Sequence, residues 1–331
     1  AFSSGPWDEE ALWLGGEDLL KLPRPNNEMP GLELAATEGG YYTFYGDSSA
    51  VFIRCPERFR HRPSQADLLH VDLWWRGENL AIDAGTFSYN LPDPWNNALV
   101  HTEVHNTARI SGFDQTEHVS RFLFLPWPNG YVRHRENSQS GKLLYWEGEH
   151  NGYRHLKPSA KHRRAVVRLG DECWVVVDEV QTSGADRWDV NWLFPDVPYA
   201  MLSDNGIDNC LTLEMCAGCY KVRWFAQHSS LSADLVRADS LTARGWCSRY
   251  YLKKEPALSL RLSLTGGSGT VFTVFAPEDL EVSWSTNRLQ VSGAQWSGTL
   301  KFTGEHSGKS LLAESLKYEQ DDEMEELFFK S

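Results

Sequence analysis

The side chains best suited to acid–base or metal chemistry gather in residues 58–112. Asp83 ends a strand-like segment at a turn that contains Gly85, and His105 opens another such segment. Gln65 stands shortly before the alternating segment LLHVDLWW. Polar groups at strand ends of a β-rich protein can converge on one rim. We therefore treat Gln65, Asp83 and His105 as candidates for a shared site.

His101 and His105 are four residues apart in the segment HTEVH, so on a helix they would share a face. The segment does not match the zinc-protease motif HExxH, because Glu103 stands in the third place of the segment and not in the second. The spacing therefore disfavours a zinc protease.

The elements around these residues read as many short strands separated by turn signals, without alternating long helices. This pattern predicts an all-β fold, a large antiparallel β-sandwich, and disfavours Rossmann and TIM folds. We expect three parts: an irregular linker at residues 1–38, the sandwich at 39–310, and an acidic tail at 311–331. The tail is expected to pack as a terminal helix or to stay mobile.

Composition limits the function further. A net charge of −13 argues against a general nucleic-acid binder, which needs a basic face. No apolar run approaches the roughly 20 residues of a membrane-spanning helix. The basic run 161–164 is expected on a solvated strand edge or loop. Cys216 and Cys219 form a single CxxC, which we interpret as the ends of a turn between two strands, because a zinc site needs a second pair.

An ordered series of motifs resembles the C-terminal domain of the heparinase II/III-like polysaccharide lyases. The series runs QAD, IDAGTFSYN, WNNA, HNT, GYRHL, HRRAVVRLGDECWVVVDEV, GWCSRYY and EPALSL, and it spans most of residues 39–280. The resemblance implies a super-sandwich that forms one wall of a cleft, with an N-terminal α/α toroid as the other wall. It also implies cleavage of an acidic, uronate-containing polysaccharide by β-elimination. The chain has no long amphipathic helices to build a toroid, so we expect the isolated chain to be inactive.

The resemblance also assigns roles to particular residues. The family's His-Asp-His metal ligands fall on Gln65, Asp83 and His105, and the family's substrate-facing histidine falls on Pro63. Zinc prefers nitrogen and sulfur ligands, and calcium accepts an amide oxygen but is ill-suited to an imidazole. Two interpretations follow. The three residues bind one divalent ion, with zinc favoured over calcium, or they form a hydrogen-bonded cluster without metal.

Further candidate residues lie outside the set of Gln65, Asp83 and His105. The candidate catalytic residues are His105, Tyr89 and His101, and His61 or His101 could replace the missing histidine at Pro63. The candidate substrate-binding residues are Arg62, Asn96, Arg249 and Tyr250, with Tyr251 beside them.

The family resemblance implies that the chain works in the periplasm or outside the cell. The alternative function is a non-catalytic carbohydrate-binding or assembly domain. A metal-dependent hydrolase is a third class, which the poor ligand set disfavours.

Overall fold

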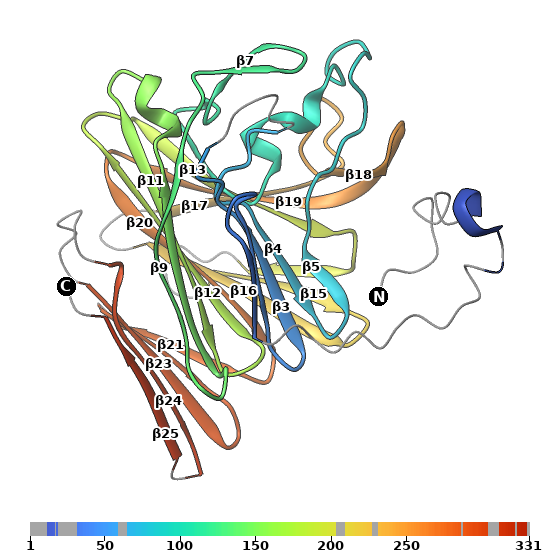
Figure 1. Cartoon of the computed structure of the whole chain (residues 1–331). Helices are drawn as coiled ribbons and strands as arrows, with labels where there is room; N and C mark the ends of the chain where they lie inside the picture. The colour runs from blue at the N-terminus through green and yellow to red at the C-terminus, as the bar shows by residue number, and fades with distance from the viewer. Residues whose placement is uncertain are drawn as a thin grey trace.

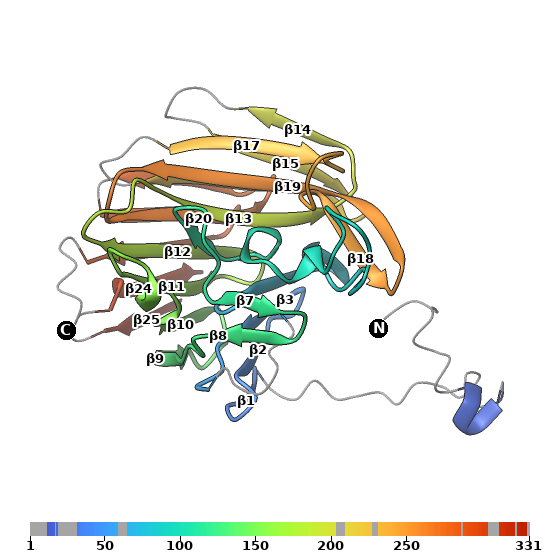
Figure 2. The same ribbon diagram turned by 90° about the horizontal axis from the view of Figure 1, so that it is seen from above.

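A computed structural model describes residues 12–16, 18, 32–58, 65–202, 209–226, 231–285, 287–303, 311–321 and 323–329. The named strands pair antiparallel in stacked sheets, which confirms the all-β sandwich (Figures 1 and 2). Among the described residues, no helix is long and apolar enough to cross a membrane.

An eight-stranded sheet forms the middle layer. Its order is β14 (Tyr199–Leu202), β15 (Cys210–Met215), β16 (Gly218–Ala226), β20 (Gly269–Pro277), β12 (Cys173–Thr182), β11 (Ala160–Leu169), β10 (Leu143–His150) and β9 (Gly130–Asn137). Successive side chains of a strand point to opposite faces. Val166 accordingly lies in one hydrophobic core and Val167 in the other. Both faces are therefore covered, which explains the unbroken runs of buried residues in β11 and β12.

Two further sheets cover one face of this layer across the larger core. The first runs β1 (Glu33–Ala36), β2 (Tyr41–Tyr45), β3 (Ser49–Arg54), β4 (Val71–Trp75) and β5 (Glu78–Ala81). The second runs β17 (Leu231–Arg237), β19 (Lys253–Thr265), β13 (Arg187–Pro195) and β6 (Ala108–Ile110), with β18 (Trp246–Tyr250) paired to β19. The pairing of β1 with β2 begins the sandwich at Glu33, inside the segment expected as linker.

The acidic C-terminal residues are strands, so the prediction of a helix or mobile tail there was wrong. The fourth sheet runs β21 (Glu281–Ser285), β22 (Arg288–Ser292), β23 (Trp296–Phe302), β24 (Ala313–Gln320) and β25 (Glu323–Phe328). It packs on the other face of the middle layer, where Leu316 is fully buried (Figure 1). β24 and β25 form a hairpin. The burial of its alternate apolar side chains holds this hairpin in the sheet.

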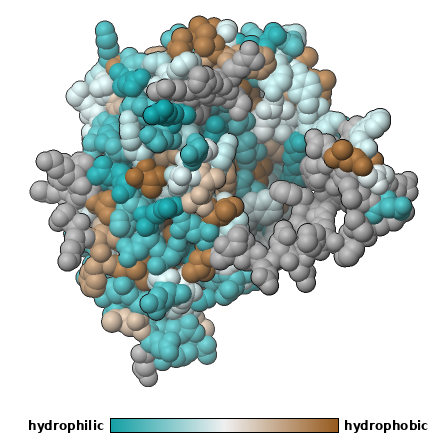
Figure 3. All heavy atoms as spheres, viewed as in Figure 1, coloured by the Kyte–Doolittle hydropathy of each residue, from teal (hydrophilic) through white to brown (hydrophobic). Residues whose placement is uncertain are grey.

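Loops and short helices gather at one end of the sandwich (Figure 1). They include the two-stranded arm β7 (Glu117–Ser120) and β8 (Leu123–Leu125), and the 3-10 helices η2 (Ala98–Val100), η3 (Thr102–Val104) and η4 (Gly152–His155). Figure 3 shows a hydrophobic patch over this arm, whose exposed apolar residues are Val119, Phe122, Leu123 and Leu125. Most of the described candidate residues lie in the connections between β3 and β6, and Arg249 and Tyr250 lie on β18.

Candidate functional site

Asp83 lies just beyond β5, where the chain turns away from the sheet. Gly85 fixes this turn, because its φ of 73° is in the left-handed region and a Cβ there would lie 2.1 Å from the carbonyl oxygen of Ser248. A side chain at this position would therefore clash with the β18 strand. The Asp83 carboxylate accepts the Gly85 backbone N–H at 2.7 Å, so the same turn also orients the carboxylate.

Asn106, the middle residue of HNT, joins three strands through its side chain. Its Nδ2 donates to the carbonyl oxygens of Val71 and Ile82, at 2.8 and 3.0 Å. Its Oδ1 accepts the backbone N–H of Leu193 in β13 at 2.6 Å. A buried amide with all these bonds satisfied stabilises one local geometry, so Asn106 holds its neighbour His105 in place.

Arg164 anchors the same region from the middle layer. Its Nη1 donates to the carbonyl oxygens of Leu69, at 2.7 Å, and of Asn106. The other side of the guanidinium pairs with both carboxylate oxygens of Asp178, and neither side chain is exposed. One buried ion pair thus fixes the two segments that carry His70 and His105.

This arrangement corrects the expectation of a solvated basic run at residues 161–164. Arg163 is also buried and donates to Glu147 at 2.7 Å, whereas Lys161 remains partly exposed. The cause is the position of β11 between β10 and β12, inside a sheet that is covered on both faces. Buried charges need partners, and Glu147 and Asp178 supply them.

His70, Asp83 and His105 form a His-Asp-His cluster of a composition that could hold a metal ion. The Nδ1 of His105 lies 2.8 Å from Oδ1 of Asp83, and the Nε2 of His70 lies 3.7 Å from the same oxygen. Sequence reasoning found Asp83 and His105 but missed His70. Gln65, its predicted third member, instead donates to the Gly85 carbonyl at 2.9 Å.

The hydrogen bonds determine where the protons lie. The Asp83 carboxylate can only accept, so Nδ1 of His105 carries a proton and donates it. The Nδ1 of His70 accepts the Asn106 backbone N–H at 3.1 Å, so this nitrogen has no proton. A neutral His70 ring therefore carries its proton on Nε2, facing Asp83.

The pKa values agree with this assignment. Burial lowers the pKa of His70 to about 4, against the opposing charge of Asp83, so the ring is neutral near pH 7. Burial would also lower the pKa of His105, but the charge and hydrogen bond of Asp83 raise it above the ordinary value. Burial would raise the pKa of Asp83, and His105 outweighs it and lowers this pKa below the usual range.

The donor types would suit zinc, but the orientation of His70 does not fit a zinc ligand. A metal-bound histidine normally donates its other ring N–H to an acceptor. In His70 the other ring nitrogen receives a hydrogen bond from Asn106 instead. Coordination through Nε2 would either move the ring proton to Nδ1 and break the Asn106 hydrogen bond, or remove it and leave an imidazolate. The hydrogen bonding therefore favours the metal-free cluster.

Asp83 borders a cavity of about 780 Å³, which we call the Asp83 cavity. Arg249, Asp72, Trp74 and Asn79 line it as well. Burial raises the pKa of Asp72 to about 7, although the Asn79 amide donates to it at 2.7 Å. The cavity thus combines a cation, an aromatic ring and a carboxyl group that titrates near neutrality. Nothing in the sequence marked Asp72 as more than an alternating polar residue of a strand.

The structure brings Tyr89 next to Tyr251, two residues after Arg249, which lines this cavity. Tyr89 packs on Tyr251 and Phe122, with ring centroids 5.5 and 5.2 Å apart. Tyr250 is exposed on β18, and Asn96 is exposed on the loop that follows β5. Arg62, Pro63 and His61 lie outside the described residues.

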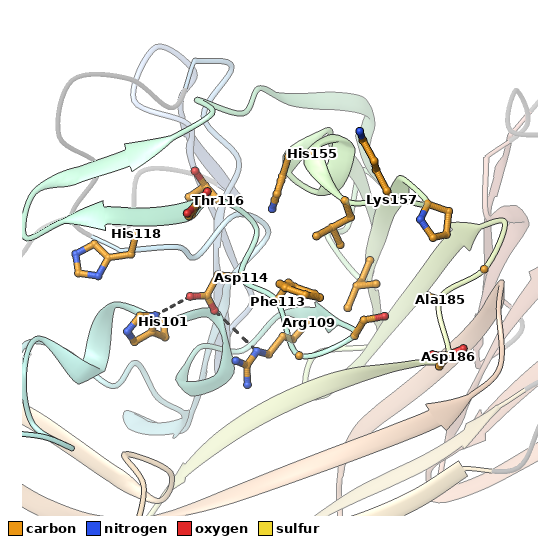
Figure 4. Close-up of a pocket in the computed structure, with 17 residues that line it drawn as sticks. His101, Arg109, Phe113, Asp114, Thr116, His118, His155, Lys157, Ala185 and Asp186 are labelled. Carbon is orange, nitrogen blue, oxygen red and sulfur yellow. Dashed lines mark hydrogen bonds and ion pairs between the residues drawn. The ribbon is translucent and has the colours of Figure 1, made fainter.

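His101 lines a different cavity, of about 790 Å³, which we call the His101 cavity (Figure 4). Its Nδ1 lies 2.6 Å from Oδ2 of Asp114, which also accepts the Thr102 backbone N–H and lies 3.9 Å from Arg109. The Asp114 hydrogen bond raises the pKa of His101. His101 does not line the Asp83 cavity, so the hypothesis that it replaces the missing histidine there is abandoned.

Cys216 lies in the turn between β15 and β16 and Cys219 lies in β16, which confirms the predicted turn between two strands.

The sequence and fold of this chain are similar to those of known proteins. Residues 29–287 match the heparinase II/III-like C-terminal domain. A heparin-sulfate lyase from Bacteroides stercoris is 24% identical over 240 residues, which cover 69% of this chain and 31% of the lyase. The heparan sulfate lyase HepC of Pedobacter heparinus has a TM-score of 0.63 at 16% identity, covering 97% of this chain and 46% of the lyase.

A second solved structure, a heparinase III, has a TM-score of 0.62 at 16% identity and covers 98% of this chain and 46% of that protein. The chain therefore spans less than half the length of these relatives. The family match covers most of the described sandwich, and the chain belongs to the heparinase II/III-like C-terminal domain family.

Proposed function

We propose that this chain is the β-sandwich part of a lyase that cleaves an acidic, uronate-containing polysaccharide by β-elimination. The Asp83 cavity would form one wall of the active-site cleft, and an N-terminal α/α toroid would form the other. Family membership supports the proposal, as do the names of the relatives, which are lyases of heparin and heparan sulfate.

One observation carries the proposal: the Asp83 cavity joins Arg249 and Asp72 beside the Asp83–His105 pair. β-Elimination removes the proton at C5 of a uronate, protonates the departing O4 and builds negative charge on the carboxylate. Arg249, whose side chain is 60% exposed, can bind that carboxylate. Asp72 can exchange a proton near neutral pH.

Within this account the Asp83–His105–His70 cluster orients the rim and does not itself transfer protons. The side chain of His105 is fully buried, and its Nε2 has no hydrogen-bond partner among the described residues. A substrate sugar therefore reaches Asp83, which is one-third exposed, before it reaches either imidazole.

The experiment is an absorbance assay for the unsaturated product, with the full-length protein and with residues 1–331. We expect product from the full-length protein on heparan sulfate or another uronate polysaccharide, and none from residues 1–331 alone. Turnover by the isolated chain would overturn the division of the site between two domains. Binding without turnover by the full-length protein would favour a non-catalytic carbohydrate-binding domain.

A further inference from the structure

Lys254 points its ammonium group into a cage of three aromatic rings. Its Nζ lies 3.3 Å from the ring centroid of Trp95, 4.1 Å from that of Trp246 and 5.6 Å from that of Phe87. The faces of aromatic rings attract cations, most strongly those of tryptophan. Among the described residues, no carboxylate forms an ion pair with Lys254, so the rings are its partners. Desolvation by this cage lowers the pKa of Lys254.

The rings also interlock with one another. Trp95 meets Phe87 edge to face at 5.3 Å and 80°, and it meets Trp246 at 5.7 Å and 89°. Such tilted contacts are the preferred geometry of aromatic pairs. Removing the ammonium group would leave an unfilled space between the three rings.

The cage joins two segments that are far apart in the sequence. Phe87 and Trp95 belong to the loop at residues 82–97, whereas Trp246 and Lys254 belong to the β18–β19 hairpin. Backbone bonds join only the start of the loop to the hairpin. They run from the Ser248 N–H to the Ala84 carbonyl and from the Leu252 N–H to the Phe87 carbonyl, both at 2.8 Å.

Beyond Phe87, side chains hold the loop to the hairpin. Tyr89 contacts Tyr251 only through packed rings and a long hydrogen bond of 3.4 Å from its backbone N–H. Trp95, at the far end of the loop, reaches the hairpin through the Lys254 cage. The cage therefore closes the loop against the hairpin at the point where backbone pairing has ended.

We propose that Lys254 is a positioning residue, whose ammonium clamps the 82–97 loop to the hairpin and so fixes Tyr89 and Arg249 around the ligand of the Asp83 cavity. The ligand is an acidic saccharide, and this part of the inference rests on the proposed function. The clamp itself does not depend on that function. It depends on the cation, so a side chain of similar length without charge cannot replace Lys254.

The first test measures hydrogen–deuterium exchange of the Leu252 amide, which donates to Phe87. In the Lys254→Met variant this amide should exchange about tenfold faster, because the cation–π contacts that close the loop are lost. Lys254→Arg should restore slow exchange. Lys253→Met is the matched control and should change little, since Lys253 approaches only the Tyr250 ring, at 5.5 Å. Unchanged exchange in Lys254→Met would overturn the clamp.

The second test measures saccharide turnover by the same variants of the full-length protein. Lys254→Met should raise KM several-fold with a smaller change in kcat, and Lys254→Arg should restore KM. Faster exchange with an unchanged KM would overturn the positioning role and leave the clamp. If the unsubstituted protein shows no turnover, the proposed function fails, and the exchange measurement still decides whether the clamp exists.

Discussion

Two aspartate–histidine pairs flank the η3 turn, four residues apart, and they differ in almost everything except composition. The Asp83–His105 pair has a fully buried imidazole, whereas the His101 side chain of the Asp114 pair is about one-third exposed. Both histidines have extended backbone on either side of the turn. The turn therefore directs the His101 ring into the His101 cavity and the His105 ring into the protein interior against Asp83, whereas an α-helix would place both on one face.

The difference lies in what holds each pair. His70 and His105 belong to segments fixed from the middle layer by the Arg164–Asp178 ion pair, and the turn at Gly85 orients Asp83 beside them. Asp114 is held locally, by the Thr102 backbone and by Arg109, whose side chain is one-fifth exposed. Two aspartate–histidine pairs whose histidines are four residues apart thus give one site built on the core and one built on a loop. Sites on rigid elements are positioned more accurately than sites on loops.

Removal of the core anchor should have the largest effect on stability. We expect Arg164→Met to lower the free energy of unfolding by about 3–5 kcal/mol, because Asp178 would remain as an unpaired buried charge. The equivalent change at the other pair, Arg109→Met, should cost no more than about 1 kcal/mol. Urea unfolding of both variants measures the difference. Equal losses would contradict the contrast between core and loop.

His70 and His101 should also respond to pH with opposite signs. The pKa of His70 is lowered from 6.5 to about 4, so between these values the unfolded chain binds a proton that the folded chain does not. His70 therefore favours folding above pH 6.5, and this contribution, roughly 3 kcal/mol, is lost as the pH falls toward 4. The pKa of His101 is raised, so its contribution is present below the unfolded pKa and is lost as the pH rises through the folded value.

Unfolding free energies between pH 4 and pH 8 test this contrast. The variant His70→Gln should flatten the dependence between pH 4 and 6.5, whereas His101→Gln should flatten it above pH 6.5. A steeper acid dependence in His70→Gln would show that the ring is not neutral in the folded protein.

The smallest effect should come from metal. Because the proton arrangement of His70 opposes coordination, we expect the purified chain to carry zinc well below one ion per molecule, and chelators to leave its melting temperature unchanged. Metal analysis by mass spectrometry measures this. Stoichiometric zinc that disappears in Asp83→Ala would contradict the metal-free cluster.

The sequence predicted the antiparallel sandwich because alternation and turn residues act locally. It could not predict His70. This ring reaches Asp83 because Leu69 has a φ of 60°, an uncommon value for a residue with a Cβ, and Arg164 holds its carbonyl. A distant arginine that stabilises a left-handed leucine leaves no local pattern. The family resemblance placed this ligand at Gln65 instead.

The C-terminal hairpin was missed for a different reason. The acidic composition of residues 314–328 resembles a solvated tail, but Leu316, Tyr318 and Leu327 are buried, whereas Glu314, Glu319 and Glu323 are exposed. The turn at Asp321, with a φ of 47°, closes the hairpin. Charge dominated the prediction where the period of two should have decided it.

The most direct test compares Asp83→Asn with Asp114→Asn in the full-length protein, with the unsaturated product followed by absorbance. The account predicts that Asp83→Asn lowers kcat/KM by about 10- to 100-fold, as for residues that orient a site through hydrogen bonds. Asp114→Asn should lower it less than about threefold. Equal losses, or no product from the unsubstituted protein on heparan sulfate, chondroitin sulfate, hyaluronan and alginate, would contradict the account.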